Sequence, residues 1–165
     1  MTNHNESGAN GAENIALDNA LDIVTLARVM EAMKTFDVEL TTVPGEQQLA
    51  TANLNGFGVL FAVLNSAVIV RADVITSVTF THADASLFLA AGSVNNTLLG
   101  ARVVITERNN ELVVRTEREF NCAAAMNDQQ LHSALKKAVD GVIAAQDAMF
   151  EAAQKVSALA SEEEN

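Results

Sequence analysis

The most regular pattern along this chain is a series of short apolar runs separated by two-residue turns that begin with asparagine. Three such runs follow one another: Leu49–Leu54, Phe57–Leu64 and Ala67–Val74. The turns between them are Asn55-Gly56 and Asn65-Ser66. Turns of this kind connect β-hairpins because both of their residues adopt positive φ angles. The pattern therefore predicts a three-stranded antiparallel meander in which the residues beside each turn pair with each other.

Side chains alternate along each strand, so this meander has one apolar face and one mixed face. The apolar face, which we expect in the core, carries Ala50, Ala52, Val59, Phe61, Val63, Val68 and Val70. The mixed face carries Leu49, Leu60, Ala62, Leu64 and Ile69 beside the polar Thr51, Arg71 and Asp73. If helices cover only the first face, the apolar residues of the second are exposed and mark an interface. The alternative is that the C-terminal helix packs on them.

A second hairpin is predicted around the turn Asn109-Asn110, between Ala101–Glu107 and Glu111–Glu119. The implied pairing places Arg102 opposite Glu117 on one face. The other face then carries four apolar residues: Val103, Ile105, Leu112 and Val114. An opposite-charge pair that faces water and apolar residues that face inward support the same register.

Three segments have the apolar spacing of helices: Leu21–Phe36, His82–Leu99 and Asn127 to about Ala160. Asp18 or Asn19 could cap the first helix and Asp84 the second, while Val38–Val43 forms an extended run. The predicted order is α-β(3)-α-β(2)-α, an antiparallel meander sheet with flanking helices of the α+β class. We expect a disordered tail over residues 1–17, a single domain over 18–160 and an acidic tail over 161–165.

The last predicted helix begins at Asn127-Asp128-Gln129-Gln130, which is typical of a capping box. Its apolar stripe consists of Leu135, Ala138, Val142, Ala145, Met149, Ala152, Val156 and Leu159. A stripe of this length indicates either a coiled coil or a core helix that extends beyond its domain. Gly141 interrupts the stripe and few opposite charges flank it, which favours the core helix.

Composition argues against nucleic acid as a partner. The net charge is −11, which repels phosphate, and the chain has no Trp or Tyr on which bases could stack. Cys122 is the only cysteine, so no intrachain disulfide can form, which favours a cytoplasmic location. We also expect no signal peptide in residues 1–14 and no membrane span, because no apolar run is long enough.

The groups that could carry chemistry are scattered. His4, His82 and His132 lack the spacing of metal ligands. Cys122 and His132 could form a nucleophile and a base, but no third group orients them, so we interpret the cysteine as structural. Carboxylates and arginines alternate in the second hairpin, which is typical of a solvated sheet face: Glu107, Glu111, Glu117 and Glu119 with Arg102, Arg108, Arg115 and Arg118. We therefore predict no catalytic residue, no metal site and no cofactor.

The order of elements and four local features resemble the YbjN-domain family of bacterial proteins. The features are Asn95-Asn96 at the end of the central helix, the hairpin Ala101–Glu119, the link Cys122–Met126 and the long helix that starts at Asn127-Asp128-Gln129-Gln130-Leu131. The resemblance spans about Leu21 to Phe150. It implies a type III secretion chaperone-like fold, like that of small acidic dimeric binding proteins, and a role as a sensory transduction regulator. The family has no accepted catalytic residues, so it implies none in this chain.

These observations predict a non-enzymatic, cytoplasmic protein-binding module that forms a homodimer and has a chaperone-like or regulatory role. The predicted interface residues are Leu49, Leu60, Leu64, Ile69, Val142 and Met149. One alternative is an enzyme or a small-ligand-binding protein with a pocket between sheet and helices, lined by Phe61, Phe80 or Phe88. Another is a structural oligomer that assembles through the Leu135–Leu159 stripe.

Overall fold

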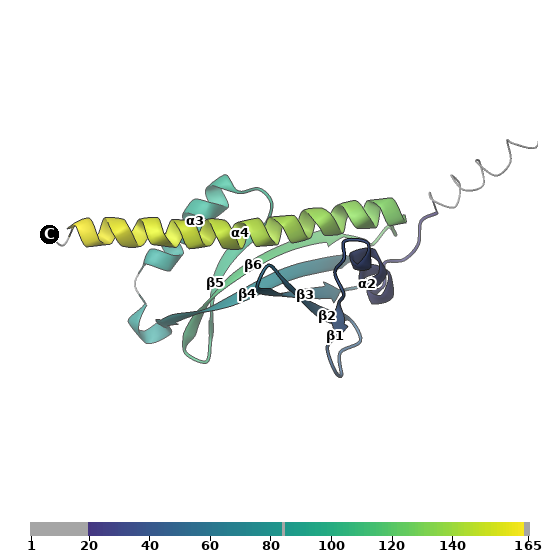
Figure 1. Cartoon of the computed structure of the whole chain (residues 1–165), viewed down its shortest axis with the longest axis horizontal. Coiled ribbons are helices and arrows are strands. Elements are labelled where there is room, and N and C mark those ends of the chain that lie inside the picture. Colours follow the sequence, from purple (N-terminus) through teal and green to yellow (C-terminus); the bar gives the residue numbers. More distant parts are fainter. Residues whose placement is uncertain (1–19, 84, 164–165) are drawn as a thin grey trace, which may run out of the picture.

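A computed structural model describes residues 20–83 and 85–163, which form one antiparallel sheet of six strands with helices packed against it (Figure 1). The strands are β1 (Thr41–Thr42), β2 (Leu49–Leu54), β3 (Phe57–Val63), β4 (Ala67–Thr79), β5 (Arg102–Arg108) and β6 (Glu111–Asn121). The helices are α2 (Leu26–Lys34), the short 3₁₀ helix η1 (Phe80–His82), α3 (Ser86–Thr97) and α4 (Asp128–Glu163). The strands lie side by side in the order β1-β2-β3-β4-β6-β5, so the predicted α+β meander is confirmed.

The predicted three-stranded meander is present with its predicted register. Leu54 pairs with Phe57 across the first turn, where Asn55 and Gly56 have φ angles of 51° and 87°. At the second turn the backbone N–H of Leu64 donates to the carbonyl of Ala67 at 2.8 Å, which keeps the predicted pairing, but neither Asn65 nor Ser66 has the positive φ angle that was predicted. Strand β4 continues to Thr79, beyond the predicted end at residue 74, because its second half pairs with β6.

The second hairpin also has the predicted register. Asn109 and Asn110 both have positive φ angles, and Arg102 pairs with Glu117 across the two strands. Val103, Leu112 and Val114 are buried on the opposite face, and the partly buried Ile105 packs against the cluster that contains Val103 and Val114. Two asparagines therefore form this turn in place of the more common Asn-Gly sequence.

The first predicted helix is shorter than expected. It begins at Leu26, and Thr25 is its N-cap, since the Oγ1 of Thr25 accepts a hydrogen bond from the backbone N–H of Arg28 at 3.3 Å. Asp22 instead forms an isolated antiparallel bridge with Met126, with backbone hydrogen bonds of 3.3 and 3.0 Å. This pairing with a distant segment keeps the residues before Thr25 out of the helix. The predicted caps Asp18 and Asn19 lie outside the described residues.

Three other predicted boundaries also shift. The extended run Val38–Val43 contains only the two-residue strand β1, and α3 begins at Ser86 rather than at residue 82, because η1 precedes it. Helix α4 continues to Glu163, past the expected domain end at residue 160. The predicted tail over residues 1–17 and the cap Asp84 fall outside the described part of the chain.

The three α-helices of the described chain cover one face of the sheet, which we call the inner face (Figure 1). Helix α2 and the first half of α4 pack with the inner-face residues of β2, β3 and β4, among which Val59, Phe61, Val68 and Val70 are fully buried. Helix α3 and the second half of α4 pack over Val103 and Val114 of β5 and β6. The predicted core face is thus confirmed.

Helix α4 runs along the inner face over β4, β6 and β5 and is longer than the sheet (Figure 1). Its buried apolar side chains are Leu131, Leu135, Ala138, Val142, Ala145 and Met149. Beyond them the stripe becomes accessible, and Leu159 is 64 % exposed. The helix is therefore a core helix that extends past the sheet, which is the alternative that the sequence favoured.

The predicted capping box at the start of α4 is also present. The N–H of Gln130 donates to the Oδ1 of Asn127 at 2.8 Å, and the N–H of Asn127 donates to the Oε1 of Gln130 at 3.0 Å.

Candidate functional site: the outer face of the sheet

The face of the sheet opposite the helices, here called the outer face, is the candidate binding surface. Strand pairing arranges its side chains in rows that cross the strands. One row is Leu49–Ala62–Ile69–Glu119, and the next is Thr51–Leu60–Arg71–Glu117–Arg102. A third is Asp73–Arg115–Val104. The rows change from apolar over β2 and β3 to charged over β4, β6 and β5.

The apolar part of this face, which we call the outer patch, consists of Leu49, Leu60, Ala62, Leu64 and Ile69. Leu64 is 44 % exposed, and Leu49, Leu60 and Ile69 are half-buried. These residues belong to neither core cluster, and the three α-helices of the described chain pack on the other face. The alternative that the C-terminal helix covers the outer patch is therefore wrong, because the apolar stripe of α4 faces the inner side.

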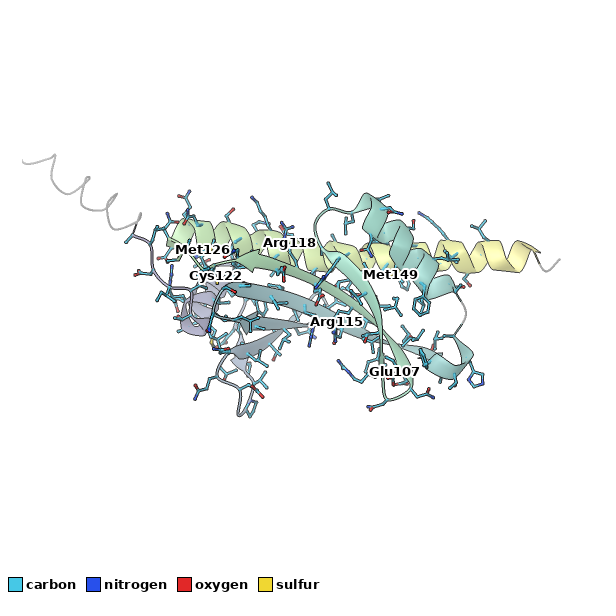
Figure 2. The ribbon with its side chains drawn as sticks, turned by 180° about the vertical axis from the view of Figure 1, so that it is seen from behind. Glu107, Arg115, Arg118, Cys122, Met126 and Met149 are labelled. Carbon is cyan, nitrogen blue, oxygen red and sulfur yellow. The ribbon has the colours of Figure 1, made fainter. Side chains whose placement is uncertain are left out.

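Asp73 is the centre of the charged part. Its Oδ1 accepts from the Nε of Arg115 at 2.8 Å, and its Oδ2 accepts from the Nη2 of Arg108 at 2.7 Å and the Nη2 of Arg115 at 3.0 Å. Arg71 adds a third guanidinium, with its Nε 3.7 Å from the same Oδ1. In Figure 2, Arg115 lies in the middle of the sheet. One carboxylate is thus shared by three arginines from three strands.

The arginines keep Asp73 ionised. Burial by itself raises the pKa of Asp73, but the hydrogen bonds from Arg115 and Arg108 and the charge of Arg71 outweigh it, so the pKa is lowered. The hydrogen bond to Asp73 in turn raises the pKa of Arg115. At neutral pH the cluster is therefore a fixed arrangement of one carboxylate and three guanidinium groups.

The charges on the outer face balance, although the chain as a whole is strongly acidic. The Nη2 of Arg102 lies 2.6 Å from the Oε1 of Glu117, which confirms the predicted pair. The strand residues on this face supply four arginines and four carboxylates: Arg71, Arg102, Arg108 and Arg115 with Asp73, Glu111, Glu117 and Glu119. The net charge of −11 therefore lies elsewhere on the molecule.

Two of the predicted interface residues are placed differently from the other four. Val142 is fully buried and Met149 is 2 % exposed, and in Figure 2 Met149 lies between the helices and the strands. Both side chains belong to the core of a single chain, so they are not available to a partner in this fold. This corrects the expectation that the middle of the long helix supplies part of an interface.

The other candidate groups do not converge. His82 contacts Thr79 and Thr81 through its Nδ1, and the ring of His132 lies 5.6 Å from that of Phe36. Burial raises the pKa of the Cys122 thiol, which disfavours the reactive thiolate. Within residues 20–83 and 85–163 no three His, Cys, Asp or Glu side chains are grouped as metal ligands. His4 lies outside the described residues.

The predicted pocket residues are also dispersed. Phe61 is fully buried in the core, whereas Phe80 and Phe88 are 58 % and 48 % exposed. A cleft between sheet and helices does exist, but Phe57 and Phe150 line it instead. Phe57 lies four residues before Phe61 on the same strand, so alternation along the strand places both side chains on the inner face. The sequence pattern does not indicate which part of that face α4 leaves uncovered.

No described helix combines the length and the apolar character needed to cross a membrane.

No protein-family model matches the sequence, and no curated protein matches it. Among solved structures, the fold is similar to that of YbjN from E. coli, a proposed transcription regulator, with a TM-score of 0.63. The match covers 82 % of this chain and 96 % of that one at 10 % sequence identity. The chain therefore has a YbjN-like fold.

Proposed function

We propose that this chain is a non-enzymatic protein-binding module that forms a homodimer through the outer face and has a regulatory or chaperone-like role. The observation that carries the proposal is the outer patch. All three α-helices of the described chain cover the inner face, yet Leu49, Leu60 and Ile69 form a contiguous apolar surface on the other side. Contiguous apolar surfaces on soluble domains usually mark interfaces.

The surroundings of the outer patch support a protein as the partner. An apolar centre beside ordered arginines and carboxylates has the composition of a protein interface, in which arginine is enriched and a polar rim surrounds the buried centre. The arginines are already held in place by Asp73 and Glu117, so binding orders few side chains.

The charge balance favours a second copy of the same chain as the first occupant. Two molecules that each carry a charge of −11 repel each other over most of their surfaces. The outer face is the region where four arginines offset four carboxylates, so two copies can meet there without net repulsion. A two-fold contact also lets Arg102 or Arg108 of one copy meet a carboxylate of the other.

Two observations support the regulatory or chaperone-like role. The similar structure of YbjN belongs to a protein described as a proposed transcription regulator, and no three His, Cys, Asp or Glu side chains of the described chain are grouped as metal ligands. A binding role, with docking in place of bond chemistry, is consistent with both observations.

The test is the mass of the purified protein in solution, measured by light scattering after size exclusion across a dilution series. We expect a dimer for the unchanged chain and a monomer for Leu60→Glu, because the substitution places a charge in the middle of the outer patch. Ser133→Glu adds the same charge at an exposed position on α4 and serves as the control that stays dimeric.

Circular dichroism of Leu60→Glu must show native helix content for the comparison to hold, and Leu64→Glu at the more exposed end of the patch provides a second variant. A monomeric wild type at every concentration would overturn the homodimer. A wild-type dimer that persists in both variants would place the interface elsewhere.

A further inference from the structure

The three helices leave one part of the inner face uncovered. Helix α2 packs on this face beside the first half of α4. Helix α3 packs beside the second half of α4, on the side of β5. Beside the second half of α4, toward β3 and β4, there is a cleft of about 640 Å³. Its volume lies within the range of roughly 300–1,000 Å³ that is typical of small-molecule sites.

The walls of this cleft are mainly apolar. Phe57, Val74 and Val114 form the floor on the sheet, and Met149 and Phe150 of α4 form one wall. Leu87 closes the end at the start of α3. Phe150 is 68 % exposed, which is unusual for a phenylalanine in a helix that otherwise buries its apolar stripe. A ligand in the cleft would remove this ring from water.

A buried amide gives the cleft one fixed polar group. Gln146 is only 5 % exposed, and its Nε2 donates to the carbonyls of Ala72 and Val114 at 3.2 Å each. Two carbonyl acceptors require the NH₂ group on that side, so the orientation of the amide is determined. No described residue donates to the Oε1 of Gln146, and this oxygen is not sealed from solvent. Because Gln146 lines the cleft, this oxygen is an unused acceptor on a residue of its wall.

The charges at the edge of the cleft are all negative. Asp147 and Glu151 lie one helical turn apart on α4, and neither forms an ion pair with a described residue. No lysine, arginine or histidine lines the cleft. Like charges at this spacing repel each other, and a cation between them relieves that repulsion. The exposed face of Phe150 also attracts cations through its π electrons.

We propose that this cleft binds a small apolar molecule that carries a positively charged amine. The hydrocarbon part lies on Phe57, Val74 and Met149, and the ammonium group lies at the edge between Asp147, Glu151 and the ring of Phe150. The Oε1 of Gln146 accepts a hydrogen bond from a donor on the ligand. An anionic ligand such as a fatty acid is disfavoured, because its carboxylate would meet two carboxylates and no cation.

The proposal can be tested with three eight-carbon probes that differ only in the head group: n-octylamine, n-octanol and octanoate. The ε-methyl resonance of Met149 reports binding, because this side chain lines the cleft. We expect the amine to shift this resonance and to bind at least ten-fold more tightly than the alcohol, and we expect no saturable shift with octanoate.

Two double variants distinguish binding of the amine at this site from the general attraction of a cation to an acidic protein. Asp147→Asn combined with Glu151→Gln should reduce the affinity for the amine at least ten-fold and leave that for the alcohol unchanged. Glu39→Gln combined with Glu46→Gln removes the same charge from exposed positions outside the cleft and should change neither affinity.

Equal affinities of amine and alcohol in the unchanged chain would overturn the proposal, as would a preference for the amine that survives the Asp147 and Glu151 substitutions. Absence of a saturable shift at Met149 with any probe would also overturn it. These experiments do not test the outer face, so their outcome for the amine site is independent of the homodimer.

Discussion

Gly141 of α4 packs directly against the backbone of Gly100, which lies in the segment that leads into β5. A β-carbon on Gly141 would overlap the carbonyl oxygen of Gly100 and lie 2.9 Å from its carbonyl carbon. The same carbonyl oxygen accepts a hydrogen bond from the Nη1 of Arg118 at 2.6 Å. The glycine that interrupts the apolar stripe of the helix therefore lets the backbone of α4 lie directly against the backbone of the segment before β5.

Gly141→Ala should destabilise the fold by about 2 kcal/mol, because the added methyl group meets backbone atoms that cannot rotate away. This cost exceeds the gain in helix propensity of about 1 kcal/mol. Urea unfolding followed by circular dichroism measures the difference. Gly92→Ala in α3 is the matched control: a β-carbon there meets nothing within 4 Å, so we expect a gain of about 0.5–1 kcal/mol. A stable Gly141→Ala protein would contradict the close approach.

Asp73→Asn should destabilise the fold by about 1 kcal/mol at pH 7, because the arginine cluster loses the carboxylate that neutralises it and solvent screens part of the effect. The pKa of Asp73 is lowered in the folded state, so its contribution is present at pH values above the unfolded pKa of about 3.9 and is lost as the pH falls through the folded pKa. The difference in unfolding free energy between wild type and variant should therefore be constant near pH 7 and decrease in acid.

Asp140→Asn is the control for the cluster. Asp140 pairs with Lys136 one turn away on α4, with both side chains more than half exposed. Exposed pairs of this kind contribute little, so we expect almost no change in unfolding free energy at any pH. Equal effects of the two substitutions would mean that the arginines do not depend on Asp73.

Asn127→Ala should cost about 1 kcal/mol, because the side chain satisfies a backbone N–H in the first turn of α4 and alanine cannot. Gln129→Ala changes an exposed neighbour outside this reciprocal pair and should have little effect. Thermal unfolding followed by circular dichroism compares the two variants. A larger loss for Gln129→Ala than for Asn127→Ala would contradict the capping box.

Cys122 should react slowly with a disulfide reagent such as Ellman's reagent in the folded protein. The side chain is 6 % exposed, and burial raises its pKa, so both access and the thiolate fraction are reduced. Denaturant should raise the rate to that of a free thiol at the same pH. Rapid reaction of the folded protein would contradict the buried position.

The sequence was most informative where structure is local. The turns at Asn55 and Asn109 determine the pairing of the strands beside them, and alternation then assigns each side chain to a face. The same logic could not show that Asp73 meets Arg115, because these residues belong to different hairpins and no turn specifies how β4 pairs with β6. The charged part of the candidate site was therefore visible only as separate residues.

Helix positions were less predictable for the same reason. The apolar spacing of residues 21–36 is compatible with one long helix, but the bridge between Asp22 and Met126, 104 residues apart in sequence, holds the first part extended. The stripe of α4 showed that Val142 and Met149 are apolar without showing which surface they face. Tertiary contacts decide both questions, and periodicity alone contains no information about them.

The position of α4 at the end of the order of elements has a consequence for how the molecule is made. This helix contacts α2, α3, β4, β5 and β6, so most of the inner face depends on it for cover. During synthesis the strands leave the ribosome before the helix that shields them, and Val59, Phe61 and Val70 have no complete partner surface until α4 has followed. Until translation has passed the second half of α4, the nascent sheet therefore exposes apolar side chains, which is the condition under which incompletely folded chains aggregate.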